Sequence, residues 1–203
     1  MKTIALLSQK GGSGKSTIAT HLAVCAARDD KAVAIFDIDP QASAISWARR
    51  RKSENPPVVK ATSVQLPGLL KTARKQKADL IIIDTAGRSD IAASHVIQAV
   101  DLVLIPCRPS AADLDAIEAT IRLVTNADSK RASVVLNQIP TRGCMGEEAR
   151  VAISARIDVA PVGLFMRSAY SRAWNDGRSV EEYEPKGKAA WEIKALYNWI
   201  MKA

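Results

Sequence analysis

Short apolar runs alternate with longer amphipathic stretches along the whole chain. This alternation is typical of β-α units, in which parallel strands are joined by helices that cross over the sheet. The expected strands cover residues 3–7, 32–36, 58–61, 80–84, 102–106, 133–136 and 162–165. The expected helices cover residues 15–28, 41–51, 66–76, 91–99, 111–125, 147–156, 168–176 and 188–201. The sequence therefore predicts an α/β fold with a doubly wound, mainly parallel sheet and helices on both faces.

The length and the connecting segments predict a single domain over residues 1–203. A chain of 203 residues is enough for one ordinary α/β domain. Segments 55–57 and 140–146 are rich in turn-forming residues but too short to be linkers. The apolar runs are far shorter than the roughly 20 residues needed to cross a bilayer, and the first residues lack the features of a secretory signal. We therefore expect a cytoplasmic protein that does not span a membrane.

A glycine-rich loop joins the first expected strand to the first expected helix. Glycines let successive backbone N–H groups point at phosphate oxygens, and the N-terminus of the helix adds partial positive charge. In such a loop, Lys15 reaches the β- and γ-phosphates of a nucleotide, and the hydroxyl group of Ser16 binds Mg²⁺. The residues that we predict to bind the nucleotide are Lys10, Gly11, Gly12, Ser13, Gly14, Lys15, Ser16 and Thr17.

The loop departs from the ordinary Walker A pattern at its first position. That pattern needs a glycine five positions before Gly14, where this chain has Gln9, followed by Lys10. The run Lys-Gly-Gly-x-Gly-Lys-Ser resembles the deviant Walker A motif of the ParA/MinD family of P-loop ATPases. The resemblance implies ATP and Mg²⁺ as cofactors, catalytic roles for Lys10 and Lys15, and a homodimer in which Lys10 reaches the nucleotide of the other subunit. The alternative is a glycine-rich turn capped by a serine.

Two acidic segments follow expected strands and complete the predicted site. The segment 37–41 resembles the family's Asp-x-Asp-Pro-Gln switch, which implies that Asp39 positions the attacking water and that Asp37 supports the metal. Phosphoryl transfer requires an oriented water and neutralised charge more than a strong base. Asp84 ends a buried aliphatic run, as in a Walker B strand that holds Mg²⁺ through water. The predicted metal site is therefore Ser16, Asp37 and Asp84, although an Asp-Pro turn with a helix-capping carboxylate is an alternative for segment 37–41.

Two further positions resemble family elements around the nucleotide. Residues 85–87 resemble the second switch, which senses the γ-phosphate. Asn137 ends the run 134–136 and matches the position at which many family members use a polar residue to read adenine. Its amide group suits the edge of a base. A turn asparagine at the end of a strand is the alternative.

The distribution of charge bears on DNA binding. The formal net charge is +8, and between residues 46 and 80 nine basic side chains oppose only Glu54 and Asp79. Family members tend to bind DNA through a C-terminal face, where the candidates are Arg156, Arg167, Arg172, Arg178, Lys186 and Lys188. Residues 142–203 carry ten basic and eight acidic side chains, so that face is only weakly positive. A solvated surface role is the alternative for each of these residues.

The resemblance covers nearly the whole chain and starts directly at the phosphate loop. We therefore expect no N-terminal helix-turn-helix extension of the kind that longer ParA proteins carry. The resemblance implies a short plasmid-type partition ATPase that associates with the nucleoid. Such a protein dimerises with ATP, binds DNA without sequence preference and is reset by slow hydrolysis, which a ParB-like or centromere-binding partner stimulates. A positioning ATPase for a protein cluster or a transfer complex uses the same switch and stays open.

Three other readings fit the sequence less well. An ATP-dependent metabolic enzyme similar to dethiobiotin synthetase needs neither Lys10 nor the Asp-Pro-Gln segment. A MinD-like membrane role needs a basic terminal helix, whereas segment 191–202 has only Lys194 and Lys202. A nitrogenase-reductase-like role needs suitably placed cysteines, and the three cysteines of this chain form no Cys-x-x-Cys pair.

Overall fold

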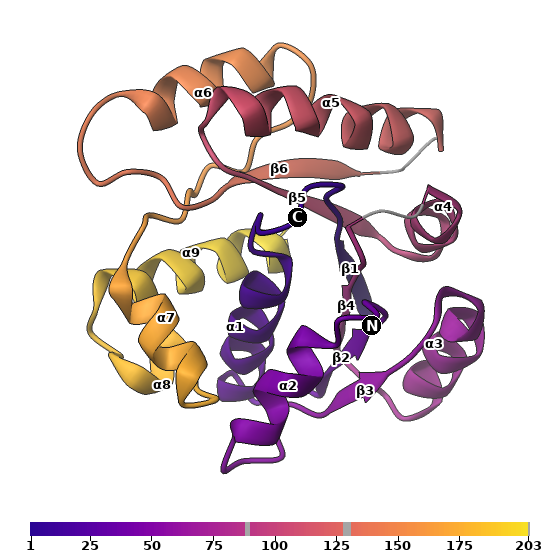
Figure 1. Ribbon diagram of the computed structural model, residues 1–203. Helices are drawn as coiled ribbons and strands as arrows, with labels where there is room; N and C mark the ends of the chain where they lie inside the picture. Colours follow the sequence, from indigo (N-terminus) through magenta and orange to yellow (C-terminus); the bar gives the residue numbers. More distant parts are fainter. Residues whose placement is uncertain (88–89, 128–130, 203) are drawn as a thin grey trace.

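A six-stranded sheet forms the centre of the molecule (Figure 1). The structure is a computed structural model that describes residues 1–87, 90–127 and 131–202, without the side chains of residues 90–92. The strands are β1 (Lys2–Leu6), β2 (Val33–Asp37), β3 (Val58–Lys60), β4 (Leu80–Asp84), β5 (Leu102–Cys107) and β6 (Ala132–Leu136). They lie in the order β3-β2-β4-β1-β5-β6, and every neighbouring pair is parallel. The predicted parallel α/β fold is confirmed.

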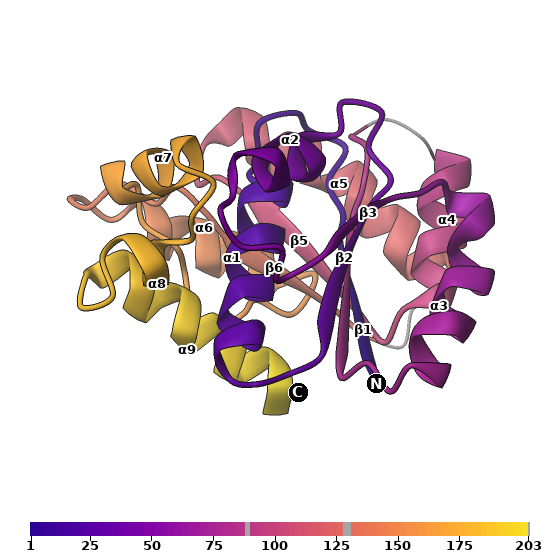
Figure 2. The same cartoon turned by 90° about the horizontal axis from the view of Figure 1, so that it is seen from below.

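Helices cover both faces of this sheet. They are α1 (Lys15–Arg28), α2 (Ser43–Arg50), η1 (Ser63–Gln65, 3-10), α3 (Leu66–Lys75), α4 (Asp90–Ala99), α5 (Ala111–Asn126), α6 (Met145–Ser154), α7 (Ser168–Asn175), α8 (Val180–Tyr183) and α9 (Lys188–Lys202). Figure 2 shows α1 and α9 on one side of the strands and α3 and α4 on the other. Among the described residues, no helix combines the length and apolar character needed to cross a membrane.

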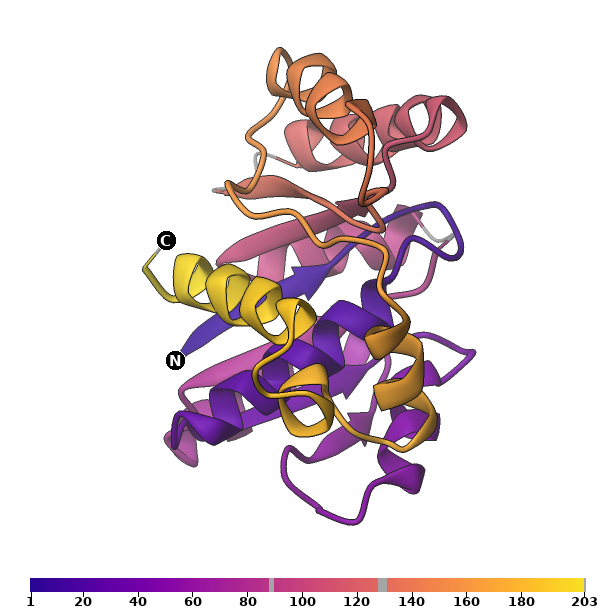
Figure 3. The same ribbon diagram turned by 90° about the vertical axis from the view of Figure 1, so that its left-hand side faces the viewer.

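Alternating side chains of the strands build a separate core on each face. Ile4 and Leu6 pack with residues of α1, α2, α7 and α9, whereas Ala5 and Leu7 point to the opposite face, where α3 to α6 pack. Figure 3 looks onto the first face, with α9 in yellow and α1 in indigo in front of the strands. Because both faces are buried, the strands read as continuous apolar runs rather than as alternating patterns.

Several local predictions were wrong, and two of them have a clear physical reason. Residues 162–165 are not a strand: Leu164 donates its N–H to Leu136 and accepts one from Ile139, but the segment forms only one isolated bridge, between Phe165 and Ile139. Pro161 has no N–H to donate. Helix α2 starts at Ser43 rather than at residue 41, because Ala42 has a left-handed φ angle of +51° and its N–H bonds the carbonyl of Asp39 in a turn.

Candidate nucleotide-binding site

The carboxyl ends of three neighbouring strands bring the predicted residues together. In the sheet register Asp84 at the end of β4 lies opposite Leu6 of β1 on one side and opposite Asp37 of β2 on the other. The glycine-rich loop leaves β1 at this same edge and enters α1 at Lys15. Parallel strands place their carboxyl ends, and the loops that follow them, at one edge of a sheet, which is where ligands of such folds bind.

The loop is shaped by two glycines and by one buried lysine. Gly12 and Gly14 have φ angles of +75° and +98°, which favour glycine. Lys15 is buried and its ammonium group donates to the carbonyl of Ser8 at 3.3 Å. Burial lowers the pKa of Lys15, while the nearby carboxylates of Asp84 and Asp39 oppose that shift. The loop therefore holds one ammonium group in a poorly solvated position that an anion would stabilise.

Asp84 is the least compensated charge of the site. Its side chain is fully buried, and neither carboxylate oxygen has a hydrogen-bond donor at bonding geometry among the described residues. Burial raises its pKa to about 7, although the nearby Ser16 hydroxyl and Lys15 favour its charged form. A buried carboxylate beside a serine hydroxyl is an oxygen donor set that suits a hard divalent cation. The predicted Mg²⁺ donors Ser16 and Asp84 thus fit the metal.

Asp37 is held differently from Asp84. Its Oδ1 accepts the N–H of Asp39 at 3.1 Å, and its Oδ2 accepts that of Ile45 at 3.0 Å. These bonds join the segment after β2 to the first turn of α2. Burial nevertheless raises the pKa of Asp37, and the two backbone bonds oppose the shift. In this structure Asp37 positions Asp39 and α2, and its supporting role at the metal stays a prediction.

A hollow of about 700 Å³, here called the loop hollow, lies in front of these groups. It is lined by Gly11, Gly12, Gly14, Lys15, Ser16, Thr17, Asp39, Pro40, Gln41, Ser43, Ala86, Gly87, Gln138 and Trp174. The predicted catalytic residues Lys15 and Asp39 both face it. Lys10 is exposed and does not belong to this lining.

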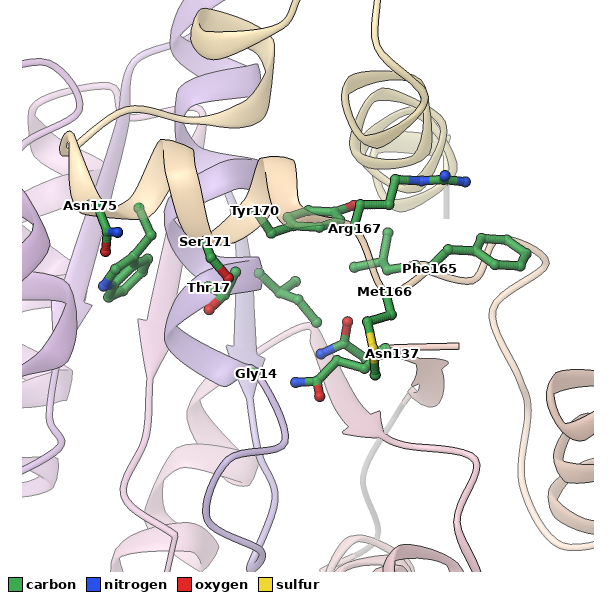
Figure 4. A pocket seen from close by; sticks show the side chains of 13 residues that line it. Gly14, Thr17, Asn137, Phe165, Met166, Arg167, Tyr170, Ser171 and Asn175 are labelled. Carbon is green, nitrogen blue, oxygen red and sulfur yellow. The ribbon is translucent and has the colours of Figure 1, made fainter. Parts of the chain in front are cut away.

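A second hollow of about 450 Å³, here called the α7 hollow, adjoins the first (Figure 4). Gly14 and Thr17 of the loop line it together with Asn137, segment 164–167 and α7. Gln138 and Trp174 line both hollows, so the two spaces share a wall. The first contains Lys15 and the glycines of the loop, and the second adds Leu164, Phe165 and Tyr170, so together they offer room for the phosphates and the base of a nucleotide.

Asn137 ties the loop to β6. Its Nδ2 donates to the carbonyl of Ser13 at 2.7 Å, and a Cβ atom on Gly14 would lie only 2.1 Å from that nitrogen. The side chain is almost fully buried. One amide N–H is used by the loop, and the carbonyl Oδ1 suits an amino group such as that of adenine. The structure thus adds a positioning role to the adenine contact that we predicted.

The family of this protein follows from the comparison of its sequence. Residues 4–179 match the family described as CobQ/CobB/MinD/ParA nucleotide binding domain. The chain belongs to this family. The predicted resemblance to ParA and MinD proteins is therefore confirmed, and nucleotide binding is the family's common property.

Relatives of this CobQ/CobB/MinD/ParA domain extend over most of its length. "Maintenance of carboxysome distribution protein A" from Gloeobacter kilaueensis is 31% identical, over 98% of this chain and 92% of that protein. "Protein ParA" from Rhizobium radiobacter is 28% identical, over 92% of this chain and 88% of that protein. The septum site-determining protein MinD from Pyrococcus horikoshii, solved with Mg-ADP, superposes with a TM-score of 0.75 at 19% identity, covering 99% of this chain and 96% of that one. The last likeness shows a shared fold.

The DNA-binding candidates of this CobQ/CobB/MinD/ParA domain do not form one cluster. Arg167 lines the α7 hollow, but its Nε donates to Glu192 of α9 at 2.7 Å, and Figure 4 shows it pointing away from Asn137. Arg156 forms an ion pair with Glu118. The exposed candidates on and after α7 are Arg172, Arg178, Lys186 and Lys188. DNA contact by any of these residues stays a prediction.

Sequence reasoning missed the part of the site that α7 supplies. Trp174 lies 160 positions after Gly14 and forms a wall of both hollows. Thr120 of α5 was also missed: its hydroxyl accepts the N–H of Gln9 at 3.2 Å and so supports the start of the loop. No local motif marks either residue, because each reaches the loop only through the packing of a distant helix.

Proposed function

We propose that this protein is an ATP-switched positioning ATPase, which distributes a cargo by binding DNA as an ATP-bound homodimer. In this proposal it works in the cytoplasm over the nucleoid, and slow hydrolysis stimulated by a partner protein releases it. The related proteins named ParA and Maintenance of carboxysome distribution protein A support this class. A plasmid with its centromere-binding protein and a protein cluster are both cargoes that such a switch can carry.

The position of Lys10 carries the proposal. The loop contains two lysines, and only Lys15 is buried against the loop hollow. Lys10 is exposed at the surface of its own subunit. A lysine that serves only the nucleotide of its own loop would lie beside Lys15. An exposed lysine at the start of the phosphate-binding loop, outside the lining of the loop hollow, instead suits a second subunit docked across that hollow.

The remaining residues have separate tasks in this switch. Backbone N–H groups of the loop and Lys15 bind the phosphates, Asn137 holds the loop, and Asp39 orients a water molecule in the loop hollow. Ser16 and Asp84 would hold Mg²⁺, which neutralises charge on the phosphates when it is bound. Phosphoryl transfer of this kind depends on positioning and charge more than on a strong base, so hydrolysis stays slow until the geometry is completed.

Substitution of the two lysines tests the proposal. Lys15→Ala should abolish nucleotide binding, whereas Lys10→Ala should leave binding to the monomer intact and lose ATP-driven dimerisation. Asp39→Ala should trap an ATP-bound dimer. Nucleotide affinity is measured by calorimetry and the oligomeric state by light scattering, with ADP, ATP and no nucleotide. Intact dimerisation and turnover of Lys10→Ala would overturn the sandwich mechanism.

DNA binding tests the second half of the proposal. Random-sequence duplex DNA should bind in the ATP state of Asp39→Ala and not with ADP, and its affinity should fall steeply with salt. A protein that binds no DNA in any nucleotide state is not a DNA-based positioning ATPase, and the metabolic alternative would then be tested with small-molecule substrates.

A further inference from the structure

Basic side chains from two distant segments meet beside the nucleotide hollows. Arg49 and Arg50 close α2, Lys52 follows them, and Arg178 lies in the turn between α7 and α8. All four are exposed. We call these four residues the α2–α8 surface. Figure 1 shows the end of α2 beside α7 and α8.

Arg51 fastens the two segments together. Its side chain is only 4% exposed and forms a two-pronged ion pair with Glu182 of α8, with both N–O distances 2.9 Å. It also donates to the carbonyl of Gly177 at 2.9 Å. Trp47 of α2 donates its Nε1–H to the carbonyl of Arg178 at 3.3 Å. The relative position of the four exposed basic residues is therefore fixed by buried contacts.

Aromatic rings support two of the guanidinium groups. Arg50 lies over the ring of Trp174 at 5.8 Å from its centroid, and Arg178 lies over Tyr183 at 5.0 Å. A guanidinium group stacked on a ring keeps its N–H edge available and loses less side-chain entropy when it binds an anion. Free surface arginines have no such support.

The chemistry of this surface fits phosphate groups better than a protein partner. Protein interfaces gather exposed aromatic and apolar side chains at their centre. None of the large apolar side chains exposed in the described part of the chain belongs to α2, to α7 or to the turn before α8. Asp176 pairs with Arg178 at 2.8 Å, but both side chains are about half exposed, so a DNA phosphate can replace that contact.

The surface is also connected to the nucleotide site. Ser43, the first residue of α2, lines the loop hollow, and Ile45 in the same turn is bonded to Asp37. Trp174, which supports Arg50, lines both hollows. One eight-residue helix therefore connects the segment around Asp39 to Arg49 and Arg50.

We propose that the α2–α8 surface binds the phosphate backbone of duplex DNA, and that α2 and Trp174 couple its geometry to the nucleotide. This inference rests on the proposed function and names the surface on which it acts. It assigns DNA contact to Arg49 and Arg50 of α2 as well as to Arg178 of the α7–α8 turn. This surface lies beside the two hollows of the nucleotide site and not on α9.

Charge reversal with a matched control tests the inference. The test variant is R49E/R50E, and the control is K71E/K75E, which changes the net charge equally on α3 at the opposite face of the sheet. Both are combined with Asp39→Ala, and binding to a random-sequence duplex is measured by fluorescence anisotropy with ATP and with ADP at several salt concentrations. ATP binding and dimerisation are measured in parallel on each variant.

We expect R49E/R50E to weaken DNA binding in the ATP state by at least about tenfold and to reduce the salt slope by about 2, because two phosphate contacts are lost. K71E/K75E should retain near-parental affinity, and both should bind ATP and dimerise. Parental affinity in R49E/R50E, or an equal loss in K71E/K75E, would overturn the surface while leaving the proposed function standing. If the parent itself binds no DNA with ATP, the proposed function fails instead.

Discussion

The last turns of α2 and α3 carry similar charge but have different surroundings. Arg49 and Arg50 close α2, and Arg74 and Lys75 close α3. The end of α2 packs on the turn before α8, on the face of α1. The end of α3 lies on the opposite face, beside a groove of about 600 Å³ shared with α4. Two helix ends with the same charge therefore have different neighbours. The end of α2 lies beside the two hollows of the nucleotide site, and the end of α3 lies beside a groove away from that site.

The two helices are also stabilised by different contacts. Helix α3 follows a capping box between Thr62 and Gln65 and packs through its own apolar residues, so its determinants are local. Helix α2 is held by Arg51 and Trp47, whose partners lie more than 120 positions away in the chain. Substitutions at the α2 contact should therefore destabilise the protein, and comparable changes on α3 should not.

Of the substitutions considered, Gly177→Ala should destabilise the protein most, because it disrupts the contact between the end of α2 and the turn before α8. Gly177 has a φ angle of +64°, and a Cβ atom there would lie 2.5 Å from backbone atoms of Arg50 and Arg51. Backbone strain and overpacking together should lower the free energy of unfolding by about 3 kcal/mol, measured by urea denaturation. Gly143→Ala is the control, because Gly143 has a φ angle of +88° with nothing within 4 Å. Equal losses in the two variants would mean that the α2 contact is loose.

The second effect concerns the ion pair between Arg51 and Glu182. Glu182→Gln removes the charge that compensates a buried guanidinium group, yet glutamine keeps the capping box with Ser179. Because Glu182 is 23% exposed, we expect a loss of about 2 kcal/mol rather than the full cost of a buried charge. The exposed pair of Asp176 with Arg178 provides the comparison: Asp176→Asn should cost less than about 0.5 kcal/mol. Similar losses by thermal unfolding would contradict this assignment.

These contacts mark the limit of prediction from sequence. The fold class and the residues of the phosphate loop could be predicted, because apolar periodicity and a contiguous motif encode them locally. The edge position of Asp37 and Asp84 could also be predicted, since both end apolar runs of parallel strands.

The rest depends on packing between distant segments. Trp174 and Arg51 reach their partners only when α7 and α8 dock on α2, and a charge count over residues 46–80 does not separate α2 from α3. The expected strand at residues 162–165 failed for a related reason, because an apolar run beside Pro161 lies along β6 without extending the sheet. The sequence predicts Asn137 as a base contact or a turn residue but not as a support of the loop, because its bond to Ser13 crosses 124 positions.

The next prediction concerns the pH dependence of stability, to which a buried histidine of α1 contributes. His21 is fully buried, its Nδ1 accepts the N–H of Val180 at 3.3 Å, and burial lowers its pKa to about 3 against the opposing charge of Glu182. Between pH 3 and about 6.5 the unfolded chain binds a proton that the folded chain does not. His21 therefore contributes a rise in stability with pH in this window of up to about 1.4 kcal/mol per unit, whereas Asp84, whose pKa is raised to about 7, contributes a fall above about pH 4.

His21→Asn isolates this contribution. The amide Oδ1 can take the place of Nδ1 as the acceptor for Val180, but it does not ionise. The stability of the variant should therefore rise less, or fall more, between pH 4 and 7 than that of the wild type. His95→Asn, at an exposed position of α4, is the matched substitution that controls for the change of residue type. A wild-type slope in His21→Asn would show that His21 does not remain neutral in the fold.

The smallest effect should have the opposite sign. Gly68 lies in the first turn of α3, is exposed, and has nothing within 4 Å of the position of a Cβ atom. Gly68→Ala should stabilise the protein by about 0.5 kcal/mol, because alanine restricts the unfolded chain without meeting a neighbour. Thermal unfolding of Gly68→Ala and of Gly177→Ala then compares the same substitution in two different surroundings. Opposite signs would show that the α2 end depends on tertiary contacts and the α3 end does not, whereas a loss at Gly68 would reveal a packing role for α3 and remove it as a neutral control.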